Sequence, residues 1–296
     1  MPIDVRTYPN SRRPGVGMKP KREGTRPLLP QHARHCPVLE AGSAMGFMVY
    51  AALEPKESFY IEYEGDGRYK FVYYLQLQQS GAPTPLFSVI MSLPLGGIGM
   101  IKEEVQFMTA APILTREAAL AVARVFLVPE DMGTPPGALA LRGATNFRTP
   151  TGWDTVYTPI FNMIERPVAP MLVVRVETDW YAHETEFHYV LQPGEGLTVS
   201  QSIPIGQVVF VPREEITMRD CTEKELQELE RSRQEFFHAK AAVVQQTGYG
   251  LSYSPHYLRQ SRAQRDKSSG AAAPTARTHG NTEPPADSDD SPTDPA

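Results

Sequence analysis

The stretch SFYIEYEGDGRYKFVYYLQLQ, residues 58–78, decides the fold class of this chain. A Gly-Asp-Gly triplet at 65–67 divides it into two halves. In both halves every second residue is aromatic or aliphatic: Phe59, Ile61 and Tyr63, then Tyr69, Phe71, Tyr73, Leu75 and Leu77. Alternation around a short glycine-containing turn is typical of a β-hairpin with one buried face. The stretch therefore predicts two antiparallel strands.

Later segments repeat the same period. In MLVVRVETDW, residues 171–180, and TEFHYVLQ, residues 185–192, apolar residues alternate with polar ones. Residues 197–212, LTVSQSIPIGQVVFVP, predict one or two more strands. Together these patterns predict a mainly β protein, an antiparallel β-sandwich or jelly-roll-like single domain over residues 36–247.

Two segments between the strands are harder to interpret. Residues 81–99 contain Pro83, Pro85 and Pro94 with paired glycines, and this composition predicts a loop. Thr115 is a suitable N-cap for REAALAVARVFL, residues 116–127. Periodicity does not separate a short helix from a buried strand there.

A C-terminal helix is predicted over residues 222–247. Thr222 and Glu225 have the spacing of a capping box, in which each side chain accepts a hydrogen bond from the backbone of the other residue. A partial apolar stripe follows beside a strongly charged face, formed by Leu226, Leu229, Phe236, Phe237 and Val243. We expect this helix to pack on the sheet or on a partner chain.

The two ends differ from the body in composition. Residues 1–35 hold eight Lys or Arg and two acids, a charge of +6, and six prolines, which favour extended backbone. Residues 279–296 hold five acids and no base. We expect an extended basic arm at 1–35 and a disordered tail, acidic at its end, at 248–296.

Composition also bears on function class. The chain has no apolar run long enough to span a membrane, and no dedicated nucleic-acid-binding surface is expected of a chain with a mildly acidic body and a net charge of −5. Two remote cysteines give no disulfide framework and favour a reducing compartment. A cytoplasmic location is expected, or a virion-associated one if a phage encodes the chain. Neither a Gly-x-Ser-x-Gly elbow nor a P-loop occurs.

Three blocks carry a resemblance to known proteins. They are FRTPTGW at 147–153, VETDW at 176–180, and Gly206 with the QVVFVPRE run that leads toward the helix. In order and spacing they resemble a family of uncharacterised bacterial and phage proteins, from about residue 36 to 241. Family members often read Thr-Pro-Pro-Gly where this chain has Thr149-Pro150-Thr151-Gly152. The resemblance implies a compact all-β domain without an established activity.

A second likeness is local. PIGQVVFVP, residues 204–212, is similar to the terminal strand of the trimeric dUTPase and dCTP deaminase β-fold. The Ser-Gly-Leu phosphate-binding turn of those enzymes has no counterpart in TPIFNMIERP, residues 158–167. The likeness implies a nucleotide hydrolase only as a remote alternative.

The block at 147–162 offers a candidate ligand site. Thr149-Pro150-Thr151-Gly152 fits a β-turn with Pro150 second and Gly152 fourth, after which Trp153 begins a strand. A structural corner is the simpler interpretation. In the functional one, Arg148 and Asn162 present hydrogen-bond donors, and Trp153 and Tyr157 form an apolar wall.

The acids after residue 176 are a second candidate. Glu177 and Asp179 share strand parity and precede Trp180, so both carboxylates can face one side. They would share a proton or bind a cation there. In the structural alternative, Asp179 caps a turn and Glu177 pairs with Arg175 or Arg148.

A divalent metal is the third candidate. In HETEFH, residues 183–188, Glu184, Glu186 and His188 fall on one face of a regular strand. A Glu/Glu/His set with open positions is typical of metal-dependent jelly-roll enzymes. The adjacent pair His183-Glu184 does not give the usual alternating ligand pair.

The sequence thus favours a non-enzymatic binding or assembly module. Its protein contacts, or its self-association, would involve residues 1–35 and the helix at 222–247. A cupin-like small-molecule-binding protein or metal-dependent enzyme is the alternative, with a pocket of Arg148, Trp153, Glu177, Asp179 and His188. No bound cofactor is expected under the first hypothesis.

Overall fold

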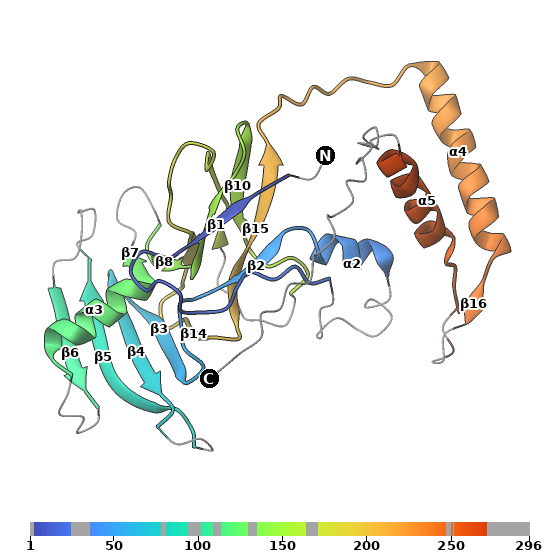
Figure 1. The fold of residues 1–296 in the computed structure, drawn as a ribbon. Coiled ribbons are helices and arrows are strands. Elements are labelled where there is room, and N and C mark those ends of the chain that lie inside the picture. The colour runs from blue at the N-terminus through green and yellow to red at the C-terminus, as the bar shows by residue number, and fades with distance from the viewer. Residues whose placement is uncertain are drawn as a thin grey trace, which may run out of the picture. The chain divides into compact units, whose positions relative to one another are not determined.

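The computed structural model describes residues 3–24, 36–77, 81–93, 102–108, 114–129, 135–163, 171–246, 250 and 252–270. It is mainly β, and every strand pairing among these residues is antiparallel (Figure 1). The predicted fold class is confirmed. The chain divides into two compact units, one of Pro2–Gln227 and one that begins at Glu228.

The predicted hairpin is present as β3 (Glu57–Gly65) and β4 (Arg68–Leu75). Asp66 and Gly67 have φ angles of 49° and 71°, the signs that a type I′ hairpin turn requires at its central positions. Register shifts between Tyr63 and Gly65, which marks a bulge before the turn. The alternating residues Phe59, Ile61, Tyr63, Tyr69, Phe71 and Tyr73 are buried.

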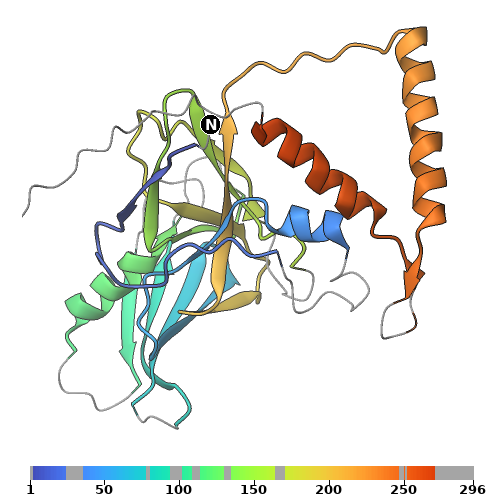
Figure 2. The same cartoon turned by 45° about the vertical axis from the view of Figure 1, so that its right-hand side comes forward.

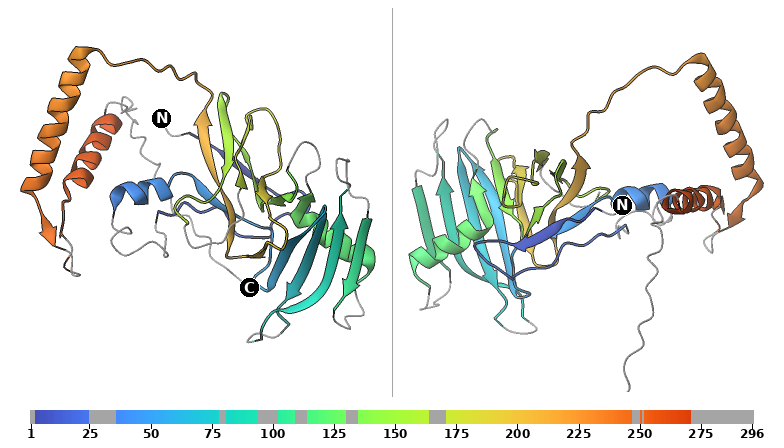
Figure 3. Two further views of the ribbon diagram at one scale, coloured as in Figure 1. Left: turned by 180° about the vertical axis from the view of Figure 1, so that it is seen from behind. Right: turned by 45° about the horizontal axis from the view of Figure 1, so that its top comes forward.

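This hairpin is the centre of a five-stranded sheet in the order β14-β3-β4-β5-β6 (Figure 3). The other strands are β5 (Thr84–Ser92), β6 (Lys102–Phe107) and β14 (Gly196–Ser200). The prediction of a loop over 81–99 is wrong for β5. Pro85 is accommodated because the register with β4 shifts between Tyr73 and Tyr74, beside this proline.

Helix α3 (Arg116–Phe126) resolves the ambiguity at 116–127. Thr115 is its N-cap, and its hydroxyl accepts a hydrogen bond from the Ala118 amide at 3.2 Å. The helix crosses one face of the five-stranded sheet (Figures 1 and 3). Phe126 packs there against Phe59 and Phe71, with ring centroids 5.0 and 6.5 Å away.

Two four-stranded sheets complete the core. One has the order β12-β10-β15-β2, formed by Val174–Val176, Trp153–Thr158, Pro204–Pro212 and Phe47–Tyr50. The other has the order β11-β13-β8-β7, formed by Met171–Leu172, Glu186–Val190, Ala138–Arg142 and Leu127–Pro129. One buried apolar cluster includes residues of all three large sheets. The Tyr69 hydroxyl also links β4 to the Ala138 carbonyl of β8 at 2.7 Å.

The N-terminal residues are part of this body, so the prediction of a separate arm is wrong for 3–24. Strand β1 (Arg6–Pro9) pairs with β9 (Thr145–Arg148), and the dark-blue chain then continues around the body (Figure 2). Arg13 forms a two-pronged ion pair with Glu57, with N–O distances of 2.6 and 2.8 Å. The prolines correctly predicted extended backbone for this segment. Composition alone does not predict that the segment pairs with a strand more than a hundred residues away. Residues 25–35 lie outside the described residues.

The predicted C-terminal helix is α4 (Glu223–Ala242), and its capping box is confirmed, but the predicted end at 247 is wrong because residues 245 and 246 form a short strand. Glu225 accepts from the Thr222 amide at 2.8 Å, and Thr222 accepts from the Glu225 amide at 3.4 Å. Helix α5 (His256–Gly270) follows a short ladder of β16 (Gln245–Gln246) and β17 (Ser252–Tyr253). The predicted disordered tail from 248 is therefore wrong for 256–270, where helix-forming Leu, Arg, Gln and Ala precede the low-complexity sequence. The acidic end lies outside the described residues.

Helix α2 (Pro37–Ser43) follows Cys36, which together with Cys221 is a free thiol. None of the described helices is both long and apolar enough to cross a membrane.

Candidate functional site

The β-turn of the FRTPTGW block begins one residue later than predicted. The Trp153 amide donates to the Pro150 carbonyl at 3.1 Å, so Pro150 is first and Gly152 third. Gly152 has a φ of 78°, which a third-position glycine supplies in a type II turn. The need for a positive φ therefore fixes the register of the turn. The Gly152 amide donates to Asp179 at 2.9 Å, which fixes the turn to the segment after β12.

Three threonine hydroxyls lie behind this turn. Thr149 and Thr155 each lie within hydrogen-bond distance of Thr178, with O–O distances of 2.9 and 2.6 Å. All three residues are buried. Thr149 also donates to the Trp153 carbonyl at 2.6 Å. A buried hydroxyl without a hydrogen-bond partner destabilises a fold, and here each hydroxyl has one. Any movement of the turn relative to β10 would break these hydrogen bonds, so they hold the two together.

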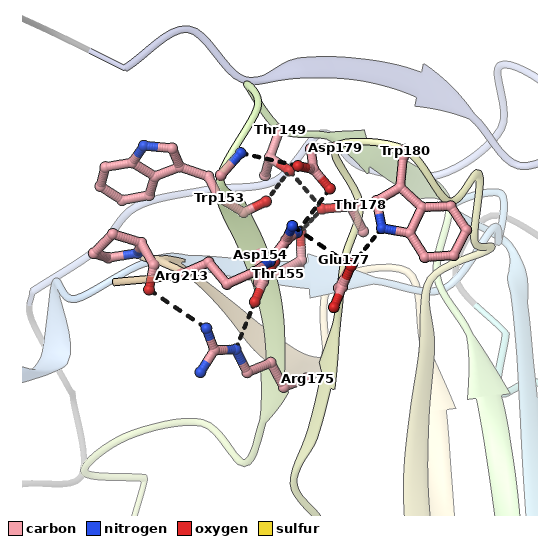
Figure 4. A network of polar contacts seen from close by, with 12 residues as sticks. Thr149, Trp153, Asp154, Thr155, Arg175, Glu177, Thr178, Asp179, Trp180 and Arg213 are labelled. Carbon is pink, nitrogen blue, oxygen red and sulfur yellow. Dashed lines mark hydrogen bonds and ion pairs between the residues drawn. The ribbon is translucent and has the colours of Figure 1, made fainter. Parts of the chain in front are cut away.

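Asp154 is the centre of an acid–arginine network, which we define as Asp154, Arg175, Glu177, Asp179 and Arg213 (Figure 4). The Asp154 side chain is 2% exposed. It accepts hydrogen bonds from Arg175 at 2.7 Å and from Arg213 at 2.5 and 2.9 Å. Arg213 also pairs with a second carboxylate, that of Asp179, at an N–O distance of 2.8 Å. The Glu177 carboxylate lies 3.5 Å from the same guanidinium.

The network keeps its carboxylates ionised. Burial opposes ionisation of Asp154, but hydrogen bonds from Arg213 and Arg175 outweigh it and lower its pKa. The Arg213 hydrogen bond, together with that from the Gly152 amide, also lowers the pKa of Asp179. Hydrogen bonds to Asp154 and Asp179 in turn raise the pKa of Arg213. Carboxylates held ionised by arginine are poor proton acceptors. The arrangement therefore suits a structural ion-pair network better than acid–base catalysis.

Glu177 and Asp179 lie in a turn and not on a strand, and both carboxylates contact the Arg213 guanidinium. Strand β12 ends at Val176, and residues 177–181 turn, with the Tyr181 amide donating to the Glu177 carbonyl at 3.0 Å. Asp179 does bind the turn, as the structural interpretation proposed. Arg213 was missed because it follows β15, and only the pairing of Trp153 with Pro212 brings it here.

Aromatic side chains border the network on the surface. Trp180 is 64% exposed, and its indole N–H donates to Glu177. Its ring lies 5.7 Å from that of Tyr181, which is also exposed. Trp153 is half-buried on the other side (Figure 4).

The remaining predicted ligand-site residues lie elsewhere. Tyr157 is in the core, where its ring meets that of Phe187 edge-on at 5.7 Å. Asn162 donates to the Leu39 carbonyl at 3.2 Å and contacts the Ser43 hydroxyl at 3.0 Å, which joins its loop to α2. Arg148 faces Arg6 across the β1–β9 pair. The prediction that these residues line one pocket with Trp153 is therefore wrong, because Tyr157 is buried in the core and Arg148 and Asn162 lie on β9 and in the loop after β10, each with its own contacts.

The predicted metal ligands form a different contact. Arg142, whose side chain is 10% exposed, lies 3.4 Å from Glu184 and 3.3 Å from Glu186. Within the described residues, no three His, Cys, Asp or Glu side chains are grouped to hold a metal ion. The set of Glu184, Glu186 and His188 is therefore wrong as a metal site, because a guanidinium already neutralises its carboxylates.

The α4 surface is the second candidate site, and we use this name for the exposed face of residues 223–242. No residue of α4 is buried among the described residues. Leu226, Leu229 and Phe237 are 50%, 58% and 53% exposed. Ile216 and Met218, in the segment before the helix, are 88% and 95% exposed. The helix and the segment before it each expose apolar side chains.

Comparison of the sequence with protein-family models finds no match, and comparison with curated proteins finds no significant one.

Proposed function

We propose that this protein is a non-enzymatic assembly module that self-associates through the α4 surface. The observation that carries the proposal is a 20-residue helix with an N-terminal capping box and no buried side chain in the described part of the chain. Helices of globular proteins derive most of their stability from packing an apolar face. A second copy of the chain supplies that packing.

The spacing of the apolar residues supports a helix pair. Positions 226, 229, 233, 236 and 240 alternate by three and four, as the seam of a coiled coil does. Leucine or phenylalanine occupies three of them, and Arg233 and Lys240 occupy the others. The long aliphatic stems of arginine and lysine cover apolar surface while their charges stay in water. Within its own unit, Phe236 already contacts His256 of α5, with ring centroids 5.1 Å apart.

Charge favours an antiparallel arrangement. Residues 223–230 hold four acids and one base, a charge of −3, whereas residues 231–242 hold three bases and one acid, a charge of +2. Antiparallel pairing of two copies places each acidic half against the basic half of the other helix. The two helix dipoles are then also opposed head to tail, which is favourable. Such a contact is self-complementary and closes as a two-fold dimer.

Light scattering coupled to size-exclusion chromatography tests the proposal on the full chain. We expect a concentration-dependent dimer, and a monomer for the double variant Leu226→Glu/Leu229→Glu. The matched control is Gln227→Glu/Gln234→Glu, which adds the same two charges at positions outside the seam. A strict monomer for the unchanged chain, or equal dissociation by both variants, contradicts the proposal.

Helix direction is tested by Cys221, which is exposed and directly precedes the helix cap. Parallel helices would bring two copies of this thiol together, and antiparallel helices keep them at opposite ends. With Cys36→Ser to remove the other thiol, mild oxidation of the dimer should leave it free of disulfide cross-links on non-reducing electrophoresis. Efficient cross-linking would indicate a parallel pair.

Deletion of the N-terminal segment is not a suitable test of this proposal. Since β1 and Arg13 belong to the body, deleting residues 1–35 removes a strand and an ion pair. Loss of association after that deletion would not identify a contact surface. Point substitutions on α4 avoid this problem.

A further inference from the structure

An apolar groove lies between the N-terminal segment and the body. Its volume is about 490 Å³, within the range of pockets that hold small molecules. Phe47, Phe147 and Phe210 form its floor, with the Phe210 ring 6.1 Å from Phe47 and 5.5 Å from Phe147. The floor comes from β2, β9 and β15, so three strands of two sheets hold it in place.

The N-terminal segment supplies both walls. One is formed by Val5 and the adjoining strand β1, where Thr7 lines the groove and Arg6 does not. The other is the stretch 15–20, which includes Val16 and Met18. This second wall is held tightly against the body. Gly17 has a φ of 100°, and a Cβ built on it would lie 2.7 Å from both the Ala51 carbonyl oxygen and the Ala144 Cβ.

Two side-chain hydrogen bonds hold the N-terminal segment to the body just after β1. The Asn10 side chain, 1% exposed, donates to the Gly143 carbonyl at 2.8 Å, and Asn146 donates to the Pro9 carbonyl at 3.2 Å. Beyond them Arg13 binds Glu57, which also accepts from the Tyr73 hydroxyl at 2.5 Å. The groove is therefore preformed, which lowers the entropic cost of binding.

Lys19 sets the chemistry of the ligand. It is the single charged residue among the described groove-lining residues, and it is exposed at the rim. It makes no ion pair with any described residue. An apolar floor with one cation at its edge is complementary to an aliphatic chain that ends in an anion.

We propose that the groove binds an aliphatic carboxylate, with the chain on the three phenylalanines and the carboxylate beside Lys19. This site is separate from the α4 surface, and its occupancy requires no second copy of the chain. Titration calorimetry of the full chain with dodecanoate should give one saturable site per chain. Decanoate should bind roughly tenfold more weakly, since each buried methylene contributes a similar increment. The neutral dodecanol should bind about two- to fivefold more weakly than dodecanoate, the difference expected of an exposed ion pair.

Two pairs of variants locate the site. Thr7→Trp fills the groove from an exposed strand position and should weaken dodecanoate binding at least about tenfold. Arg6→Trp places the same ring on the other face of β1 and should leave binding unchanged. Lys19→Met should remove the preference for dodecanoate over dodecanol, whereas Lys21→Met, on the same segment but outside the lining, should keep it.

Circular dichroism first confirms that each variant is folded. Absence of saturable binding by the unchanged chain overturns the proposal. So does binding that Thr7→Trp and Arg6→Trp affect equally. If Thr7→Trp changes the molar mass of the protein and not its ligand binding, the groove is a contact between copies, and the carboxylate assignment is wrong.

Discussion

The acid–arginine network and helix α4 both pair carboxylates with arginines, but in opposite surroundings. Asp154 is almost wholly buried, and two guanidinium groups bind it at 2.5 to 2.9 Å. On α4, Arg231 and Glu235 are 4.0 Å apart, and their side chains are 72% and 73% exposed. A buried carboxylate depends on its partners, whereas an exposed pair contributes little. The body thus contains a buried ion-pair network, whereas the ion pairs of α4 are exposed.

The largest expected effect is on the buried side of this comparison. Asp154→Asn keeps the shape of the side chain but leaves Arg175 and Arg213 without their shared carboxylate. Both arginines are partly exposed and regain water, so we expect a loss of about 2 kcal/mol, near the middle of the range for charged hydrogen bonds. Urea unfolding followed by tryptophan fluorescence measures it. An unchanged midpoint would show that the network does not support the body.

The same network gives a pH dependence. The pKa values of Asp154 and Asp179 are lowered in the folded protein, so their stabilising contribution is fully present above the unfolded value of about 4. It is lost as the pH falls from there through the lower folded values. Acid unfolding of the unchanged chain should therefore be steep below about pH 4, and less steep in Asp154→Asn. Parallel acid limbs for the two proteins would contradict the assignment.

A smaller effect is expected at the start of α4. Thr222→Ala removes the capping hydroxyl, which should lower the stability of this helix by about 1 kcal/mol. Loss of helical signal in far-ultraviolet circular dichroism on heating measures it, and urea unfolding of the body should not change. Thr222→Ser, which keeps the hydroxyl, is the control.

The smallest effect is expected for the exposed pair on α4. Glu235→Gln should change stability by less than about 0.5 kcal/mol, because water and salt screen this contact. Thermal unfolding at low and at high salt checks it. A loss as large as that of Asp154→Asn would remove the contrast between the two regions.

The fold was more predictable from sequence than the site. The alternation of apolar and polar residues in β3 and β4 predicts directly which side chains are buried. The capping box predicts the start of α4 from residues that are close in the sequence. Strand β5 was missed because a local bulge accommodates Pro85, and a bulge depends on the partner strand. In the site, Asp179 was found beside its turn. Its partner Arg213 is 34 residues away, and strand register alone brings the two together. Membership of the suspected bacterial and phage family, and the dUTPase-like alternative, stay predictions.

The pairing of β1 with β9 has a consequence for how the chain is made. The carbonyl of Pro9 binds Asn146, which is 137 positions later in the sequence. On the ribosome, residues 6–9 therefore emerge long before their partner strand is synthesised. Over that interval the three phenylalanines that the segment borders have not yet assembled. Residues 6–9 can therefore reach their final place only after residues 145–148 have been synthesised.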